Sequence, residues 1–226
     1  MRRFAISDIH GCRATFEKML TEVLQLQKED TLYLLGDYID RGPDSKGVFD
    51  VIMKLQAEGY QVHCLMGNHE DMLLRSFQSE MTADSWMMAG GGATLQSFGV
   101  EHWKDIPQKY LDFMENLSYY FELDDYLLVH AGFNFRYAKE LSDIYRDEFA
   151  MLWLRYWYKD LNPELIDGRT IVHGHTPTHW ELIKENINEN LPLDIDAGCV
   201  YEGHGMGHLC ALNMDDKTVE FLEYCG

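Results

Sequence analysis

The chain has 226 residues, of which 46% are apolar, enough to bury one full hydrophobic core. Its 19 lysines and arginines against 38 aspartates and glutamates give a formal net charge of -19, which repels nucleic-acid backbones and anionic membrane surfaces. We therefore predict a single domain over residues 1–226 and expect neither a nucleic acid nor a membrane as its partner.

The cysteines and the N-terminus indicate a compartment. Five cysteines form no Cys-x-x-Cys pair, and any disulfide scheme leaves one of them unpaired. The apolar run at the N-terminus is too short for a secretory signal peptide, and no later run is long enough to span a bilayer. We predict a cytoplasmic protein with reduced thiols, and the sequence does not indicate an oligomeric state.

Strands and helices alternate over the first part of the chain. The predicted strands are residues 4–7, 31–35 and 61–66, which are rich in apolar residues. Between them, apolar residues recur at helical spacing over residues 16–24 and again over residues 48–55. This alternation indicates an α/β fold with a parallel sheet, in which the polar loops that follow the strands share one edge.

The middle of the chain is less regular, and order returns after it. Over residues 76–118 the periodicity weakens around the run Gly90-Gly91-Gly92, and we interpret this segment as a cap-like insertion over the site. Beyond it, the pattern predicts a strand at 126–129, a helix around 140–158 and a strand at 170–172. The last predicted strands are 193–196, 208–213 and 218–224.

Carboxylate, amide and imidazole side chains follow five of the predicted strands. One such residue alone is most simply a turn former or a helix cap, but the joint occurrence after five strands forms a pattern. Oxygen and nitrogen ligands of this kind suit divalent manganese, iron or zinc, and no cysteine cluster indicates a thiolate-rich zinc site. The residues are Asp8, His10, Asp37, Asn68, His69, His130, His173 and His175.

These residues suit a pair of divalent metal ions. Two ions about 3.5–4 Å apart need a bridging carboxylate, and Asp37, at the end of the second strand, is placed for that role. The ligands that we assign to the first ion are Asp8 and His10, and those of the second are Asn68, His130 and His175. We expect manganese, with iron or zinc as alternatives.

Five motifs resemble those of one family. They are Asp8-Ile9-His10-Gly11, Gly36-Asp37-Tyr38-Ile39-Asp40-Arg41-Gly42, Gly67-Asn68-His69-Glu70, Val129-His130-Ala131-Gly132 and Gly174-His175-Thr176-Pro177. Together they resemble the calcineurin-like metallophosphoesterases, and the second and fourth motifs are most similar to the compact bacterial and phage serine/threonine phosphoprotein phosphatases. The resemblance implies a four-layer α/β/β/α sandwich, in which two mixed sheets pack face to face with helices outside.

The resemblance also implies roles for four further residues. It makes His69 the proton donor to the leaving group, with Asp40 as its orienting partner, and a protonated imidazole near a departing alkoxide would lower the barrier. Arg41 offers a fork of donors for phosphate oxygens. Arg155, in Trp153-Leu154-Arg155, resembles a second phosphate-binding arginine of the phage-like members.

The leading functional hypothesis is hydrolysis of a phosphomonoester, in a phosphorylated protein or a small phosphoester, by direct attack of a hydroxide that bridges the two metals. The resemblance makes phosphoserine or phosphothreonine the first substrate. Protein phosphatases usually place an arginine before Gly-Asn-His-Glu, where this chain has Met66. This departure favours an alternative, a dinucleoside polyphosphate hydrolase acting on diadenosine tetraphosphate. A catalytically silent metal-binding protein is the non-enzyme alternative, and His69, Asp40 and Arg41 speak against it.

Other polar positions have plainer interpretations. His204 and His208 lie in a glycine-rich loop, where solvated histidines are commoner than metal ligands. Residues 86–98 are most simply a glycine-rich turn, although such a segment could touch the substrate. We interpret His173 as a buried imidazole that does not bind metal directly.

Overall fold

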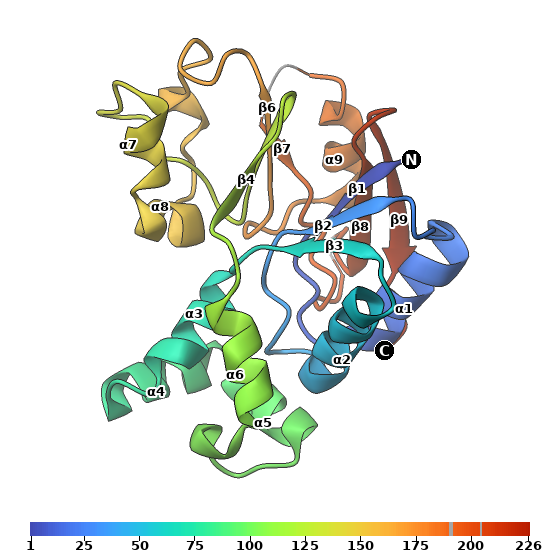
Figure 1. The fold of residues 1–226 in the computed structure, drawn as a ribbon, viewed down its shortest axis with the longest axis vertical. Coiled ribbons are helices and arrows are strands. Elements are labelled where there is room, and N and C mark those ends of the chain that lie inside the picture. Colours follow the sequence, from blue (N-terminus) through green and yellow to red (C-terminus); the bar gives the residue numbers. More distant parts are fainter. Residues whose placement is uncertain (190–191, 204) are drawn as a thin grey trace.

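The structure, a computed structural model, describes residues 1–189, 192–203 and 205–226 and contains two mixed β-sheets (Figure 1). The first has the order β3-β2-β1-β8-β9. In it β1 (Arg3–Ile6), β2 (Thr31–Leu34) and β3 (Gln61–Cys64) are parallel, whereas β8 (His208–Asn213) and β9 (Thr218–Glu223) are antiparallel. The second sheet has the order β4-β5-β6-β7, formed by Tyr120–Glu122, Tyr126–Val129, Thr170–His173 and Leu193–Asp194.

The two sheets pack face to face because their strands alternate between two apolar faces. In β1, Phe4 belongs to the core on the outer side of the first sheet, whereas Ala5 belongs to the core that both sheets share. In β5, Leu128 lines the shared core and Leu127 faces a third core on the far side of the second sheet. Because successive side chains of a strand point to opposite faces, both sheets need a cover of helices.

Helices provide that cover (Figure 1). Against the first sheet pack α1 (Arg13–Lys18) and α2 (Ser45–Ala57), and against the second pack α7 (Leu141–Tyr145) and α8 (Glu148–Trp153). The remaining α-helices of the described residues are α3 (Asn68–Arg75), α4 (Glu80–Trp86), α5 (Gly92–Phe98), α6 (Gln108–Glu115) and α9 (Trp180–Asn186). None of the described helices combines the length and the apolar character that crossing a bilayer requires.

The segment around the three glycines is helical, so its interpretation as a glycine-rich turn is wrong. A π-helical turn over Met87–Gly91 joins α4 directly to α5. Gly90 has a φ of 118°, which bends the helical run at this point. Glycine adopts this conformation without steric penalty, which explains why glycines stand at the junction of two helices.

The single helix expected around residues 140–158 is two short helices. A new helix starts at Glu148 because the side chain of Asp147 accepts a hydrogen bond from the amide of Ala150, at 2.9 Å. This helix ends where Leu154 takes an extended conformation. The chain that follows, including Arg155, is therefore free to form a loop.

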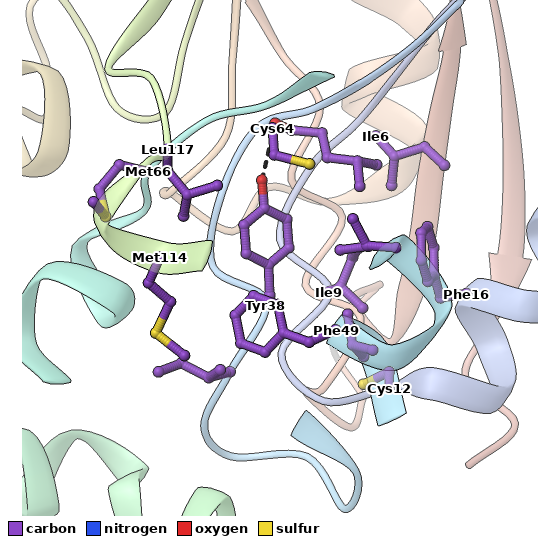
Figure 2. Packing of buried hydrophobic residues seen from close by; sticks show 14 of the residues in the cluster. Ile6, Ile9, Cys12, Phe16, Tyr38, Phe49, Cys64, Met66, Met114 and Leu117 are labelled. Atoms are coloured by element: carbon purple, nitrogen blue, oxygen red, sulfur yellow. Dashed lines mark hydrogen bonds between the residues drawn. The ribbon is translucent and has the colours of Figure 1, made fainter. Parts of the chain in front are cut away.

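Tyr38 anchors the loop after β2 in the core. Figure 2 shows its ring inside the apolar cluster, and the centroids of the Tyr38 and Phe49 rings are 5.7 Å apart. The hydroxyl of Tyr38 donates to the carbonyl of Leu65 at 2.8 Å. The loop that carries Asp37 is thereby tied to the end of β3.

Candidate active site

The predicted ligands meet at one edge of the sandwich, where the parallel strands of both sheets end. Five of them stand in loops and Asn68 begins α3, yet all of their side chains are buried, with exposed fractions between 0% and 6%. They are Asp8 and His10 after β1, Asp37 after β2, Asn68 after β3, His130 after β5 and His175 after β6. The structure thus brings together residues up to 167 positions apart in the chain.

Several site residues have the left-handed backbone conformation that residues other than glycine rarely adopt. They are His10 (φ 45°), Asp37 (54°), Asp40 (71°), Arg41 (68°) and His175 (71°). Each such position costs on the order of 1–3 kcal/mol and persists only where the surroundings enforce it. Their concentration here indicates that the geometry of the site overrides local backbone preference.

Glu70 holds the loop that carries Asp37, a role that was not predicted from the sequence. Its buried carboxylate accepts backbone hydrogen bonds from Asp37 at 2.9 Å, Tyr38 at 2.8 Å and Gly67 at 3.0 Å. The sequence does carry a signal for it, because a glutamate three residues after a helix N-cap reaches back to the N-cap amide.

Two glycines allow backbone segments to approach closely. A Cβ atom on Gly67 would lie 2.2 Å from the amide nitrogen of Asp37, and one on Gly174 would lie 2.2 Å from Oδ2 of Asp8. No larger residue fits at either position without displacing the backbone or the ligand. The space beside Gly174 lets Oδ2 of Asp8 accept a hydrogen bond from the amide of His175 at 3.1 Å, which links the two sheets.

Two groups of ligand atoms share Asp37. His10, Asp37 and His69 form one group, and Asp37, His130 and His175 form the other, with the ligand atoms of each group within 4.8 Å of one another. Oδ2 of Asp37 lies 3.6 Å from Nε2 of His10, whereas Oδ1 lies 3.5 Å from Nε2 of His130. The two oxygens face different groups, as a bridging ligand requires.

Asn68 and Asp8 lie beside these groups. Oδ1 of Asn68 is 3.0 Å from Nε2 of His130 and 2.9 Å from Nδ1 of His175. The sequence predicts Asp8 and His10 as ligands of the first ion. In the structure, the group that contains His10 includes His69 and not Asp8. The assignments of Asp8 as a ligand and of His69 as a proton donor stay proposals.

The donor set fits a pair of cations. Nδ1 of His10 donates to the carbonyl of Ile39 at 2.8 Å, and Nδ1 of His130 donates to that of Leu35 at 2.9 Å. Each ring therefore directs the lone pair of Nε2 towards the carboxylate of Asp37, so that acceptor atoms face acceptor atoms. Backbone carbonyls that orient histidines in this way are typical of metal sites, and a divalent cation would satisfy the converging atoms.

Burial shapes the charges of these ligands. Burial, and then the charge of Asp8, raise the pKa of Asp37 well above its usual range. An ionised carboxylate at this position needs nearby positive charge, which divalent cations would supply. Burial, and then His130, lower the pKa of His175 to about 2, so this imidazole is neutral at physiological pH, as a metal ligand must be.

His69 and Asp40 form a buried pair beside the ligand groups. Nδ1 of His69 lies 2.6 Å from Oδ2 of Asp40. The same carboxylate accepts hydrogen bonds from the indole of Trp86 at 2.9 Å and from the hydroxyl of Thr94 at 2.6 Å. Trp86 belongs to α4 and Thr94 to α5, so the helical segment in the middle of the chain orients this pair. Neither contact was predicted from the sequence.

The pair can hold an exchangeable proton. Burial lowers the pKa of His69 to about 3 and raises the pKa of Asp40 to about 7. Because the two groups share a short hydrogen bond, they titrate together. Between pH values of about 3 and about 7 the pair holds one proton, and it loses this proton as the pH rises through about 7. Such a proton is available to a leaving group.

Arg41 and Arg155 flank the two ligand groups. The guanidinium group of Arg41 lies beside the ring of His10 and over the ring of Tyr201, 5.5 Å from its centroid. Nε of Arg155 donates to Nε2 of His175 at 3.1 Å. Each arginine therefore lies against a histidine that is predicted to bind metal, the place that its predicted role in phosphate binding requires.

Two other histidines stand apart from the ligand groups. His173 is buried, and its Nε2 accepts a hydrogen bond from the hydroxyl of Tyr158. His204 lies outside the described residues. Nδ1 of His208 donates to the carbonyl of Met206 at 3.0 Å, and His208 belongs to neither group of metal-ligating side chains found in the described chain.

Comparison with known protein families identifies the family of this chain. The family described as calcineurin-like phosphoesterase matches residues 1–206. The chain belongs to this family. As a calcineurin-like phosphoesterase it is a metal-dependent hydrolase of phosphate esters, which confirms the predicted enzyme class.

Three relatives of this phosphoesterase represent two activity classes. A symmetrical bis(5'-nucleosyl)-tetraphosphatase of Nitrosomonas europaea is 27% identical over 80% of this chain and 60% of its own, so the chain spans less than two thirds of that relative. An asymmetrical bis(5'-nucleosyl)-tetraphosphatase of Oceanobacillus iheyensis is 26% identical over 87% of this chain and 83% of its own. Serine/threonine-protein phosphatase 1 of Salmonella typhimurium is 26% identical over 88% of each chain.

Solved structures share the fold of this phosphoesterase. A structure described as a candidate diadenosine tetraphosphatase has a TM-score of 0.67 and 20% identity, over 100% of this chain and 94% of its own. A protein serine/threonine phosphatase from Saccharomyces cerevisiae has a TM-score of 0.68 and 16% identity, over 100% of this chain and 81% of its own. At these identities the likeness shows the fold alone, and it confirms the predicted sandwich of two mixed sheets.

Proposed function

We propose that this phosphoesterase hydrolyses dinucleoside polyphosphates of the diadenosine tetraphosphate type. The observation that carries the proposal is the apolar residue before the third motif. Met66 is 4% exposed and packs in the hydrophobic core (Figure 2), so this position supplies no positive charge to a bound phosphate. The tetraphosphatases of Nitrosomonas europaea and Oceanobacillus iheyensis support the same substrate class.

The proposed mechanism divides the work among the buried residues. When bound, two divalent cations would acidify a water molecule and neutralise phosphoryl oxygens. The residues proposed to hold them are Asp8, His10, Asp37, Asn68, His130 and His175, and manganese is the ion that we expect. Arg41 and Arg155 would bind phosphate oxygens. His69 would deliver a proton to the leaving group while Asp40 keeps its ring oriented.

Phosphoserine or phosphothreonine phosphatase activity is the second candidate. The Salmonella typhimurium phosphatase favours it, because that relative matches over 88% of both chains. The buried pair of His69 and Asp40 also suits an alkoxide leaving group. An alkoxide is far more basic than the phosphate of a departing nucleotide, so it depends more strongly on a proton donor.

The test compares kcat/KM for diadenosine tetraphosphate, a phosphothreonine peptide and p-nitrophenyl phosphate, on metal-stripped protein reloaded with Mn²⁺. We expect the dinucleotide to be preferred. Asp37→Asn should lower turnover roughly 100-fold or more, because it removes the shared ligand. Asp112→Asn is the matched control, since Asp112 is exposed on α6.

Each other outcome has a definite meaning. Preference for the peptide would show that the protein is a phosphoserine or phosphothreonine phosphatase, the second candidate. Inactivity on all three substrates with metal bound would make it a silent metal-binding protein. Product analysis separates symmetrical cleavage, which yields two ADP molecules, from asymmetrical cleavage, which yields AMP and ATP.

We also propose that the protein works in the cytoplasm. All five cysteines are free thiols, and four of them are buried. Free thiols are usual in proteins kept in a reducing compartment. Cell fractionation of the producing organism, with activity as the readout, tests the location.

A further inference from the structure

A cavity of about 420 Å³ lies beside the edge of the sandwich at which the predicted metal ligands meet, and the proposed mechanism assigns no role to its interior. Its walls come from the loop after α8, the segment after β6, the end of α9 and the strand β7. Arg155 and Thr176 line the side next to His175, since Nε of Arg155 donates to Nε2 of that histidine at 3.1 Å. A phosphate bound by Arg155 would therefore lie at the mouth of this cavity.

One wall of the cavity is aromatic. It is formed by three consecutive residues, Tyr156, Trp157 and Tyr158. Trp157 is 3% exposed and lies beneath this wall, Tyr156 is 84% exposed, and the hydroxyl of Tyr158 donates to Nε2 of His173, which holds the Tyr158 ring in place. Leu193 adds an apolar surface on another side. The anchored ring of Tyr158, which is 38% exposed, suits a flat, conjugated ligand, because bases stack on such rings.

The cavity also contains polar groups. The hydroxyl of Thr178 lies 3.0 Å from Oδ2 of Asp194, and both residues line the cavity. Asn186, the last residue of α9, lines it as well and is exposed. These groups provide hydrogen-bond donors and acceptors in a cavity that is otherwise mainly apolar, the composition usual for small-molecule sites.

We propose that this cavity binds the nucleoside of a nucleotide substrate, with the base against the aromatic wall and the phosphates extending past Arg155 to the metal edge. The inference rests on the proposed dinucleotide hydrolase function and names the subsite that would recognise the nucleoside. The volume of about 420 Å³ lies within the range of roughly 300–1,000 Å³ that small-molecule pockets occupy.

A different occupant would be an apolar side chain next to the phosphorylated residue of a peptide. It could pack against the aromatic wall, but it could not bond to Asp194. The carboxylate of Asp194 already accepts from Thr178 and from the amide of Asp196, and a carboxylate has lone pairs for further donors. A nucleoside carries ribose hydroxyls that can donate to it, so this carboxylate favours the nucleoside.

The test narrows the cavity at its rim with Asn186→Trp. Asn186 is exposed and outside the proposed catalytic machinery, so the substitution should leave folding and metal binding intact. The matched control is Glu185→Trp, at the preceding exposed position of the same helix, which does not line the cavity. Thermal denaturation and metal analysis of both variants check that they are folded and loaded.

We expect Asn186→Trp to raise the KM for diadenosine tetraphosphate about tenfold or more, which corresponds to about 1.4 kcal/mol of lost binding. Hydrolysis of p-nitrophenyl phosphate, which has no nucleoside, should be unchanged, and Glu185→Trp should behave as wild type on both substrates. Adenosine, a probe without phosphate, should bind wild type and Glu185→Trp in saturation-transfer NMR and should not bind Asn186→Trp.

The possible results separate this inference from the proposed function. If the dinucleotide is hydrolysed but Asn186→Trp changes neither its KM nor adenosine binding, the subsite is wrong and the function stands. If the dinucleotide is not hydrolysed but Asn186→Trp abolishes adenosine binding, the subsite stands and the dinucleotide activity is wrong. If adenosine binds no variant and Asn186→Trp raises the KM for a phosphothreonine peptide instead, the occupant is a peptide side chain and the subsite is wrong.

Discussion

At the scale of single residues, each important side chain is held by several partners at once. The carboxylate of Asp37 accepts from the amide of His69 at 3.0 Å, while its own amide donates to Glu70. Asp40 is held from three directions, by His69, Trp86 and Thr94. Side chains fixed in this way need little reorganisation during a reaction, which is how positioned groups lower a barrier.

Replacing His69 by asparagine should slow esters with basic leaving groups most. The proton of His69 matters when phenolate leaves and much less when p-nitrophenolate leaves, because the latter is a weaker base. We expect kcat for phenyl phosphate to fall roughly 10²–10⁴-fold and kcat for p-nitrophenyl phosphate to fall by a clearly smaller factor. Equal losses on both substrates, together with a lower metal content, would show instead that His69 is a metal ligand.

At the scale of elements, the strands that carry the ligands are joined at their opposite ends. Asp30, just before β2, accepts hydrogen bonds from the amide of Arg2 at 2.9 Å, from its guanidinium group at 2.6 Å and from the amide of Gln27 at 3.0 Å. Burial alone would raise the pKa of Asp30, but these hydrogen bonds outweigh it and lower the pKa to about 2. The pair ties the start of β1 to the start of β2, so it supports the register that places Asp8 beside Asp37.

Asp30→Asn should therefore destabilise the protein in a pH-dependent way. The folded pKa of about 2 lies below the ordinary value of 3.8, so the carboxylate stabilises the fold above pH 3.8, and this contribution is lost as the pH falls through about 2. We expect a loss of about 1 kcal/mol at pH 7, a modest value because Arg2 is 41% exposed and solvent screens the pair. The loss should shrink to about half at pH 3.

Urea denaturation at the two pH values measures this difference, with Glu29→Gln, an exposed neighbour, as the control. A loss of the same size at both values would contradict a role for the ionised carboxylate and would leave only its neutral hydrogen bonds as the cause.

At the scale of the whole molecule, the net charge of -19 opposes the approach of any phosphate ester. At the site itself the charge is positive, because Arg41 and Arg155 lie against the histidines that are predicted to bind metal, and metal ions would add to this charge. The long-range field and the local field therefore have opposite signs. Salt screens the long-range repulsion more than the local attraction, because distant charges lose most of their interaction when the Debye length falls.

Raising the ionic strength from about 0.01 M to about 0.15 M, which shortens the Debye length from about 30 Å to about 8 Å, should therefore increase kcat/KM. We expect a gain of roughly twofold or more for diadenosine tetraphosphate and a smaller gain for p-nitrophenyl phosphate, which carries less charge. Steady-state kinetics in a potassium chloride series measures both. A decrease in kcat/KM with salt would show that the local positive field dominates the encounter.

Local patterns in the chain are enough to assign the family, the α/β class and the edge at which the first three polar loops meet. These features follow from local patterns, because apolar periodicity marks strands and helices and parallel strands place their following loops on one side. Asp8 and Asp37 could be brought to one edge by that argument alone, and the structure places them there, whereas His130 follows a strand of the second sheet and reaches them only through the packing of the two sheets.

The support of the site and the cavity beside it depend on how distant parts of the chain pack together. The contact of Trp86 with Asp40 joins residues 46 positions apart, and that of Glu70 with Asp37 joins residues 33 positions apart. Such contacts depend on how whole elements pack, which no local period encodes. The same holds for the cavity beyond Arg155, whose walls come from four separate segments. Its shape exists only once the second sheet, α9 and the loop after α8 have packed together.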